Sequence, residues 1–128
     1  MRNLISILIT FVFISCNVND TNDSERIITS PVPAQKIDKI IINGNALIAE
    51  VVYTTSTPCW VYDRVEKSQN DTIFTAKVFA RSDGSQICPQ VIDSILVKHS
   101  IIFQSGGDKI LRFWRYDSTY LDTTITIK

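Results

Sequence analysis

The feature that most constrains the fold is a succession of short runs rich in β-branched and aromatic residues, which continues from about residue 37 to residue 128. Turn-forming residues separate the runs, and Asn43-Gly44-Asn45 is a strong hairpin signal because Asn-Gly favours the tight turns that join antiparallel strands. No window combines a helical period with capping residues. The expected strands, seven or eight in number, cover 37–42, 46–55, 59–68, 72–82, 90–103 (one bent strand or two short ones), 109–117 and 121–128.

Alternation of apolar and polar residues along three of these runs predicts strands with one buried face. The residues expected to face the core are Leu47, Ala49, Val51 and Tyr53; Phe74, Ala76, Val78 and Ala80; and Leu121, Thr123, Ile125 and Ile127. The run 109–117 leaves two arrangements open, because Leu111 and Phe113 lie on one face and Ile110, Trp114 and Tyr116 on the other. Together, these strands predict an all-β, antiparallel sandwich or barrel.

The closing segment GGDKILRFWRYDSTYLDTTITI, residues 106–127, resembles the last hairpin of an immunoglobulin-like sandwich. The resemblance implies an Ig-like β-sandwich over residues 37–128. Antibody-type domains have a longer span between their cysteines, and their core Trp lies well away from both. In this chain Trp60 is adjacent to Cys59, so no binding residues are carried over from that family.

The N-terminus has the pattern of a secretory signal. Arg2 precedes an apolar run of twelve residues, Leu4 to Ser15, which is too short to span a bilayer as a helix. The junction Phe13-Ile14-Ser15-Cys16 resembles the lipobox of bacterial lipoproteins, although Phe13 stands where Leu is usual. The resemblance implies a signal peptide over 1–15, lipidation of Cys16 and, because Asn17 follows, anchoring in the outer membrane. An uncleaved anchor and an ordinary signal peptide are the alternatives.

Residues 16–36 are expected to be the lipidated Cys16 followed by a disordered tether, because this stretch is rich in Asn, Asp, Ser and Thr and carries Pro31 and Pro33. The membrane is therefore an expected partner, reached through the lipid. Nucleic acid is not expected as a partner, because the chain has 13 basic and 13 acidic residues and no basic tract.

If Cys16 carries lipid, Cys59 and Cys88 remain as an even pair in an oxidising compartment. We predict a disulfide between them, with two buried free thiols as the alternative. The loop that it closes has about 30 residues, and the chain-entropy model gives such a cross-link about 3.5 kcal/mol.

Neither catalysis nor metal binding is expected. The single histidine, His99, is interpreted as a polar strand residue that faces water or a loop, and no strand-elbow motif presents a serine near it. One histidine and two paired cysteines are too few for a zinc site, and a calcium site needs six or more oxygen ligands. No cofactor is predicted.

The remaining candidate is a possible ligand-binding group of planar side chains, because Trp, Tyr and Arg dominate recognition surfaces. Its members are Trp60, Tyr62, Arg112, Trp114 and Tyr116. The alternative is that Trp60 and Trp114 are core residues.

These features favour a lipid-anchored, non-enzymatic binding or accessory module of the bacterial envelope, with a glycan or a protein as its partner. The composition resembles that of small lipoproteins common in Bacteroidota. A protease inhibitor of the chagasin kind and an envelope hydrolase that uses His99 are the alternatives.

Overall fold

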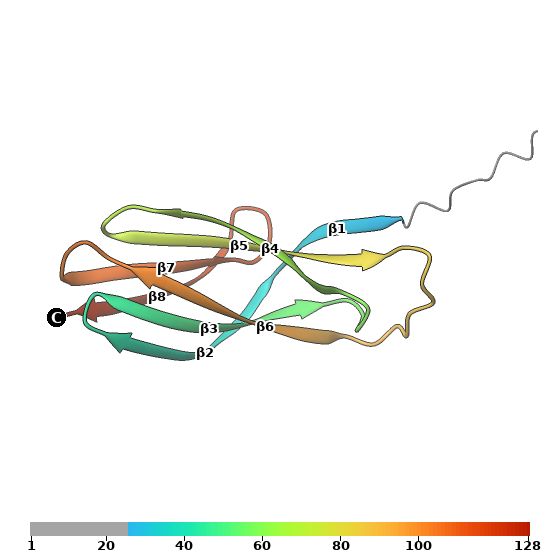
Figure 1. Cartoon of the computed structure of the whole chain (residues 1–128), viewed down its shortest axis with the longest axis horizontal. Helices are drawn as coiled ribbons and strands as arrows, with labels where there is room; N and C mark the ends of the chain where they lie inside the picture. The colour runs from blue at the N-terminus through green and yellow to red at the C-terminus, as the bar shows by residue number, and fades with distance from the viewer. Residues whose placement is uncertain (1–25) are drawn as a thin grey trace, which may run out of the picture.

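The computed structural model describes residues 26–128, and this part of the chain forms eight β-strands in two sheets without a helix (Figure 1). The strands are β1 (Ile27–Val32), β2 (Ala34–Asn43), β3 (Ala46–Thr55), β4 (Val61–Gln69), β5 (Ile73–Asp83), β6 (Asp93–Ile102), β7 (Gly107–Trp114) and β8 (Tyr120–Ile127). The predicted β-sandwich is thus confirmed, and the run 90–103 contains one strand. The predicted signal peptide, 1–15, and Cys16 lie outside the described residues.

The two sheets differ in size and pairing. Strands β2, β3 and β6 form an antiparallel sheet with β3 at its centre. In the five-stranded sheet, β4 pairs along one edge of β5, whereas the other edge is divided between β7, at residues 73–76, and β1, at residues 78–83. Strand β8 lies beside β7. We had expected an antiparallel sandwich throughout. The β5–β7 pairing is parallel, so this expectation was wrong for that pair of strands.

The ordered domain begins earlier than the expected boundary at residue 37. Residues 27–32 form β1 within the segment predicted to be a tether, and Pro31 lies opposite Phe79 in that strand. Proline is tolerated there because β1 is an edge strand, which does not need every N–H for pairing. At Pro33 the chain passes from the five-stranded to the three-stranded sheet, and the Pro33 carbonyl accepts a hydrogen bond of 3.0 Å from the Thr54 N–H.

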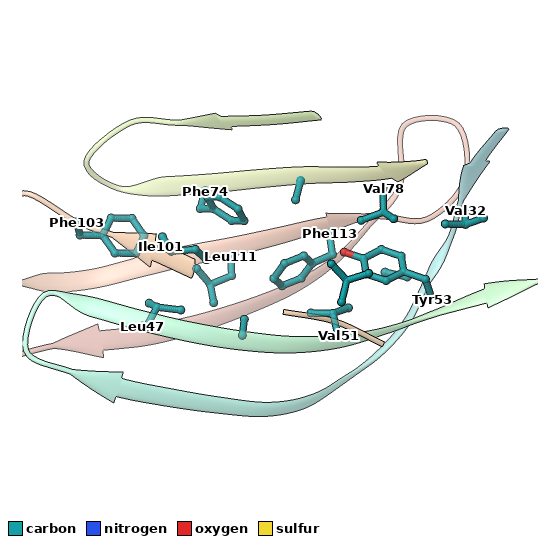
Figure 2. Packing of buried hydrophobic residues seen from close by; sticks show 14 of the residues in the cluster. Val32, Leu47, Val51, Tyr53, Phe74, Val78, Ile101, Phe103, Leu111 and Phe113 are labelled. Carbon is teal, nitrogen blue, oxygen red and sulfur yellow. The ribbon is translucent and has the colours of Figure 1, made fainter. Parts of the chain in front are cut away.

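The core lies between the sheets and contains the residues whose alternation predicted it (Figure 2). All eight predicted core residues of β3 and β5 are buried. On β8, Ile127 is buried, whereas the other three predicted positions are half-buried. On β7, Leu111 and Phe113 enter the core, and Ile110 and Trp114 lie half-buried on the outer face of the sheet.

The turns at one end of the sandwich are polar, and we call this the polar end (left in Figure 1). It consists of the turns at 43–46, 70–72 and 103–106. Gly44 adopts a positive φ of 61°, as the tight turn requires. The Asn70 Oδ1 accepts hydrogen bonds from the backbone N–H groups of Thr72 and Ile73, at 2.8 and 2.7 Å.

The other end carries exposed aliphatic side chains, and we call it the apolar end. It consists of the start of β1, the β3–β4 connection at 56–60 and the long loop at 84–92. The predicted disulfide is present here: Cys59 and Cys88 are bonded, with their Cα atoms 6.0 Å apart, and tie the connection to the loop.

Candidate functional site

The structure divides the predicted aromatic group. Trp60 is half-buried and packs against the core cluster, at the point where β1 passes the end of β3. Tyr62 lies opposite Ala80, which faces the core side of β5, whereas Arg64 lies opposite Phe79, on the outer side. Asp63 is the extra residue of a β-bulge between them. The bulge reverses the alternation, so Tyr62 and Arg64 point to opposite faces of the sheet.

The other three members lie together on the outer side of the five-stranded sheet. Arg112 and Trp114 alternate with core residues of β7 and therefore point outward. Trp114 packs against Tyr116 with ring centroids 6.4 Å apart, and its indole Nε1–H donates a 2.9 Å hydrogen bond to the Asp117 carbonyl. Asp117 has a positive φ of 51°, within the loop that joins β7 to β8.

Beside these residues the outer face is hollowed, and we call this open depression of about 310 Å³ the outer hollow. Strands β4 and β5 form one side and the end of β7 with the following loop the other. The lining residues are Glu66, Lys67, Ser68, Thr75, Lys77, Trp114, Asp117 and Tyr120.

Cations lie over the aromatic rings of this face. The Lys77 ammonium is 4.6 Å from the centroid of the Trp114 ring and 5.6 Å from that of Phe79. The Arg64 guanidinium lies 4.2 Å from the Phe79 centroid and is also bonded to Asp63 and Glu66, whose carboxylates raise its pKa. Among residues 26–128 no carboxylate lies within ion-pair distance of Lys77. The Lys77 ammonium is therefore free to meet a polar ligand.

Arg112 has less freedom. Its guanidinium lies 5.7 Å from the Tyr120 ring centroid, and its Nε is 3.5 Å from a carboxylate oxygen of Asp122. The Nε atom is buried without a hydrogen-bond partner in the described structure. Arg112 thus lies against Tyr120 at the rim of the outer hollow.

Sequence reasoning missed Glu66, Lys77 and Tyr120. Glu66 and Lys77 lie opposite each other only because of the β4–β5 register, and Tyr120 lies beside Trp114 because of the β7–β8 register. The charge complementarity of a cross-strand Glu–Lys pair was the available signal, since opposite charges favour such positions.

We had expected His99 to face water or a loop. The side chain is instead buried, with an exposed fraction of 4%. Its Nε2 is 2.9 Å from the Tyr53 hydroxyl, and its ring packs 5.2 Å from that of Phe113. Burial, with a smaller contribution from the charge of Lys67, lowers its pKa to about 4. Burial also raises the pKa of Tyr53. The pair therefore serves as a satisfied polar contact within the core.

Ser105, in the turn at 103–106, is engaged at the polar end and not with His99. Its hydroxyl donates to the Asp71 carboxylate and lies 3.2 Å from the Lys109 Nζ. This hydrogen bond is the largest cause of the lowered Asp71 pKa. Lys109, only 3% exposed, also donates to the Asp71 carbonyl. The cluster therefore joins two turns of the polar end.

Residues 26–128 contain no group of three or more His, Cys, Asp or Glu side chains placed to hold a metal ion. The search for membrane-spanning helices, made over the same part of the chain, found none that is long and apolar enough. Neither a protein-family model, nor a curated protein, nor a solved structure matches the chain.

Proposed function

We propose that the protein is a lipid-anchored, non-enzymatic binding module of the bacterial envelope and that the outer hollow binds a glycan. The observation that carries the glycan site is that the half-buried Trp114 ring lies next to the Lys77 ammonium, which has no carboxylate partner among residues 26–128. The lipobox-like junction before Cys16 supports the anchor and the outer membrane as its location.

The chemistry of the outer hollow suits a saccharide better than a protein surface. Protein partners bind most strongly through enclosed, desolvated apolar pockets, whereas this depression is open to solvent and combines an apolar surface with polar side chains. Lys77, Ser68 and Thr75 supply donors, and Glu66 and the Asp117 carbonyl supply acceptors. A sugar ring needs both for its hydroxyl groups, together with an apolar surface for its C–H groups. Trp114 provides that surface and is already held in place by its bond to Asp117.

Two variants test the glycan site. Titration calorimetry of the purified protein with envelope polysaccharides should show binding. Trp114→Ala and Lys77→Ala should each lower the affinity by about tenfold or more, equivalent to ~1.4 kcal/mol. Tyr62→Ala is the matched control, because Tyr62 is an exposed aromatic residue on the other face of the same sheet. Equal affinities in all three variants would contradict the proposal, provided that each unfolds at the temperature of the parent protein.

A separate measurement tests the anchor. Cells grown with a palmitate analogue should label the parent protein but not Cys16→Ser. Equal labelling of the two proteins would show that Cys16 is not the lipidated residue.

A further inference from the structure

The apolar end exposes large aliphatic side chains where a monomer in water would be expected to place polar ones. In the loop at 84–92, Ile87 is 97% exposed, Ile92 75% and Val91 62%. Ile27 and Ile28, at the start of β1, are also exposed. The two segments adjoin, because the Gly84 N–H donates a 2.9 Å hydrogen bond to the Arg26 carbonyl and Ile27 lies opposite Asp83. Contiguous exposed apolar side chains indicate a contact surface.

Bonds on both sides of Ile87 hold this part of the loop in place. The disulfide fixes Cys88 at the middle of the loop. At the beginning of the loop, Asp83 accepts hydrogen bonds from the N–H and hydroxyl of Ser85, and the Asp83 carbonyl accepts one from the Gln86 N–H. Ile87 therefore projects from a segment that is fixed on both sides.

We propose that the apolar end rests on the lipid bilayer that carries the anchor, with Ile87, Val91 and Ile92 inserted among the headgroups and upper acyl chains. The inference rests on the proposed function, because it takes Cys16 to be lipidated. It goes further in assigning an orientation to the domain and a lipid-contacting role to a loop that the outer hollow does not use.

The path of the chain selects the bilayer as the occupant. Cys16 is eleven residues before Ile27, and eleven residues reach at most about 40 Å when fully extended. The chain enters the domain at the base of the exposed loop (Figure 1). The polar end lies a further strand length away, about 33 Å for the ten residues of β3. The apolar end is therefore the end at which the chain from Cys16 enters the domain, and aliphatic side chains are what the interfacial region accepts.

The orientation can be tested with the complete acylated chain in vesicles of phosphatidylethanolamine and phosphatidylglycerol, with and without bromine on the acyl chains. Ile87→Trp places a fluorophore at the apolar end, and Ile102→Trp is the matched control beside the polar end. Both sites are exposed, at 97% and 65%, so neither substitution disturbs the core. Bromine quenches only a Trp ring that reaches the acyl chains.

The expected result is that brominated lipid quenches a larger fraction of the fluorescence of Ile87→Trp than of the parent protein, which carries Trp60 and Trp114. The fraction quenched in Ile102→Trp should equal that in the parent protein. If Ile87→Trp is acylated but quenched no more than the parent or than Ile102→Trp, the inference is wrong and the anchor stands. A protein partner on the apolar end would give that result. If palmitate labelling shows that Cys16 is not acylated, the proposed function fails and the bilayer orientation fails with it.

Discussion

The two ends of the sandwich are built differently. At the polar end, the turn at 70–72 is closed by the hydrogen bonds that Asn70 accepts, and the buried Lys109 joins this turn to the one at 103–106. At the apolar end, the nine-residue segment 84–92 has backbone hydrogen bonds at its beginning and is tied to the rest of the domain at its middle by the disulfide. Short turns satisfy their backbone groups locally, whereas a long loop must be fixed by another means.

The contrast also separates stability from recognition. Polar side chains at the polar end form hydrogen bonds that hold the turns together, so few of them are free to bind a partner. At the apolar end the disulfide and the hydrogen bonds of Asp83 at the start of the loop hold the segment, and its aliphatic side chains stay exposed. We expect mutations at the two ends to differ accordingly in their effect on stability.

The largest effect is expected from breaking the covalent link. Cys59→Ala combined with Cys88→Ala should lower the free energy of unfolding by about 3.5 kcal/mol, because the open chain of the unfolded state gains entropy. Urea denaturation measures the change. Cys16→Ser serves as the control and should unfold like the parent protein. A loss below about 1 kcal/mol would show that the long loop is held by other contacts.

Acid should weaken the core between the two ends and leave the disulfide intact. The pKa of His99 is lowered to about 4 from its ordinary 6.5. Between these two pH values the unfolded chain therefore binds a proton at His99 that the folded chain does not bind. His99 therefore contributes full stability above pH 6.5, and up to about 3 kcal/mol is lost as the pH falls to 4. Urea denaturation at a series of pH values measures this.

His99→Gln is the control for the acid effect, because Gln does not titrate and can still pair with the Tyr53 hydroxyl. Its stability should stay nearly constant between pH 6.5 and 4. Below that range both proteins should weaken, because Asp71 and Asp83 have lowered pKa values and lose their contribution only when protonated. The same slope in both proteins between pH 6.5 and 4 would contradict the assignment to His99.

At the polar end, Lys109→Met should cost about 2 kcal/mol, because it removes charged hydrogen bonds to the Asp71 carbonyl and the Ser105 hydroxyl while keeping the buried hydrocarbon. Lys98→Met is the comparison, since the Lys98 ammonium pairs with Glu50 at the surface, and it should cost less than about 0.5 kcal/mol. Equal losses would show that Lys109 contributes no more than a surface charge. Thermal unfolding of the two variants gives the measurement.

Much of the fold followed from local pattern. Side-chain alternation has a period of two in any strand, so Phe74 to Ala80 and Leu47 to Tyr53 were placed correctly without knowledge of their neighbours. The disulfide followed from a count of cysteines. These predictions succeeded because each depends on residues close in the sequence or on the inventory of one residue type.

The errors share a different cause, which is that each depends on a partner distant in the sequence. The β-bulge at Asp63 arises from the pairing of β4 with β5 and turns Tyr62 away from the outer face. His99 is buried because Tyr53, 46 residues earlier, supplies its hydrogen bond. Strand β1 was interpreted as tether because it follows a polar stretch and contains Pro31, which is acceptable at the edge of a sheet, and the edge exists only once the sheet is assembled. The outer hollow was only partly predicted for the same reason.

The smallest effect on folding is expected at the most exposed residue of the apolar end. Ile87→Ser should change the free energy of unfolding by less than about 0.5 kcal/mol, because a side chain that is 97% exposed loses no packing when it is shortened. Val97→Ser is the contrasting variant, since Val97 is a buried aliphatic residue of the core, and it should cost about 2 kcal/mol or more. Urea denaturation of the purified variants gives both values. A large loss in Ile87→Ser would mean that Ile87 packs against the domain in solution, and the contrast between an end that stabilises the fold and an end that is free to meet a surface would not hold.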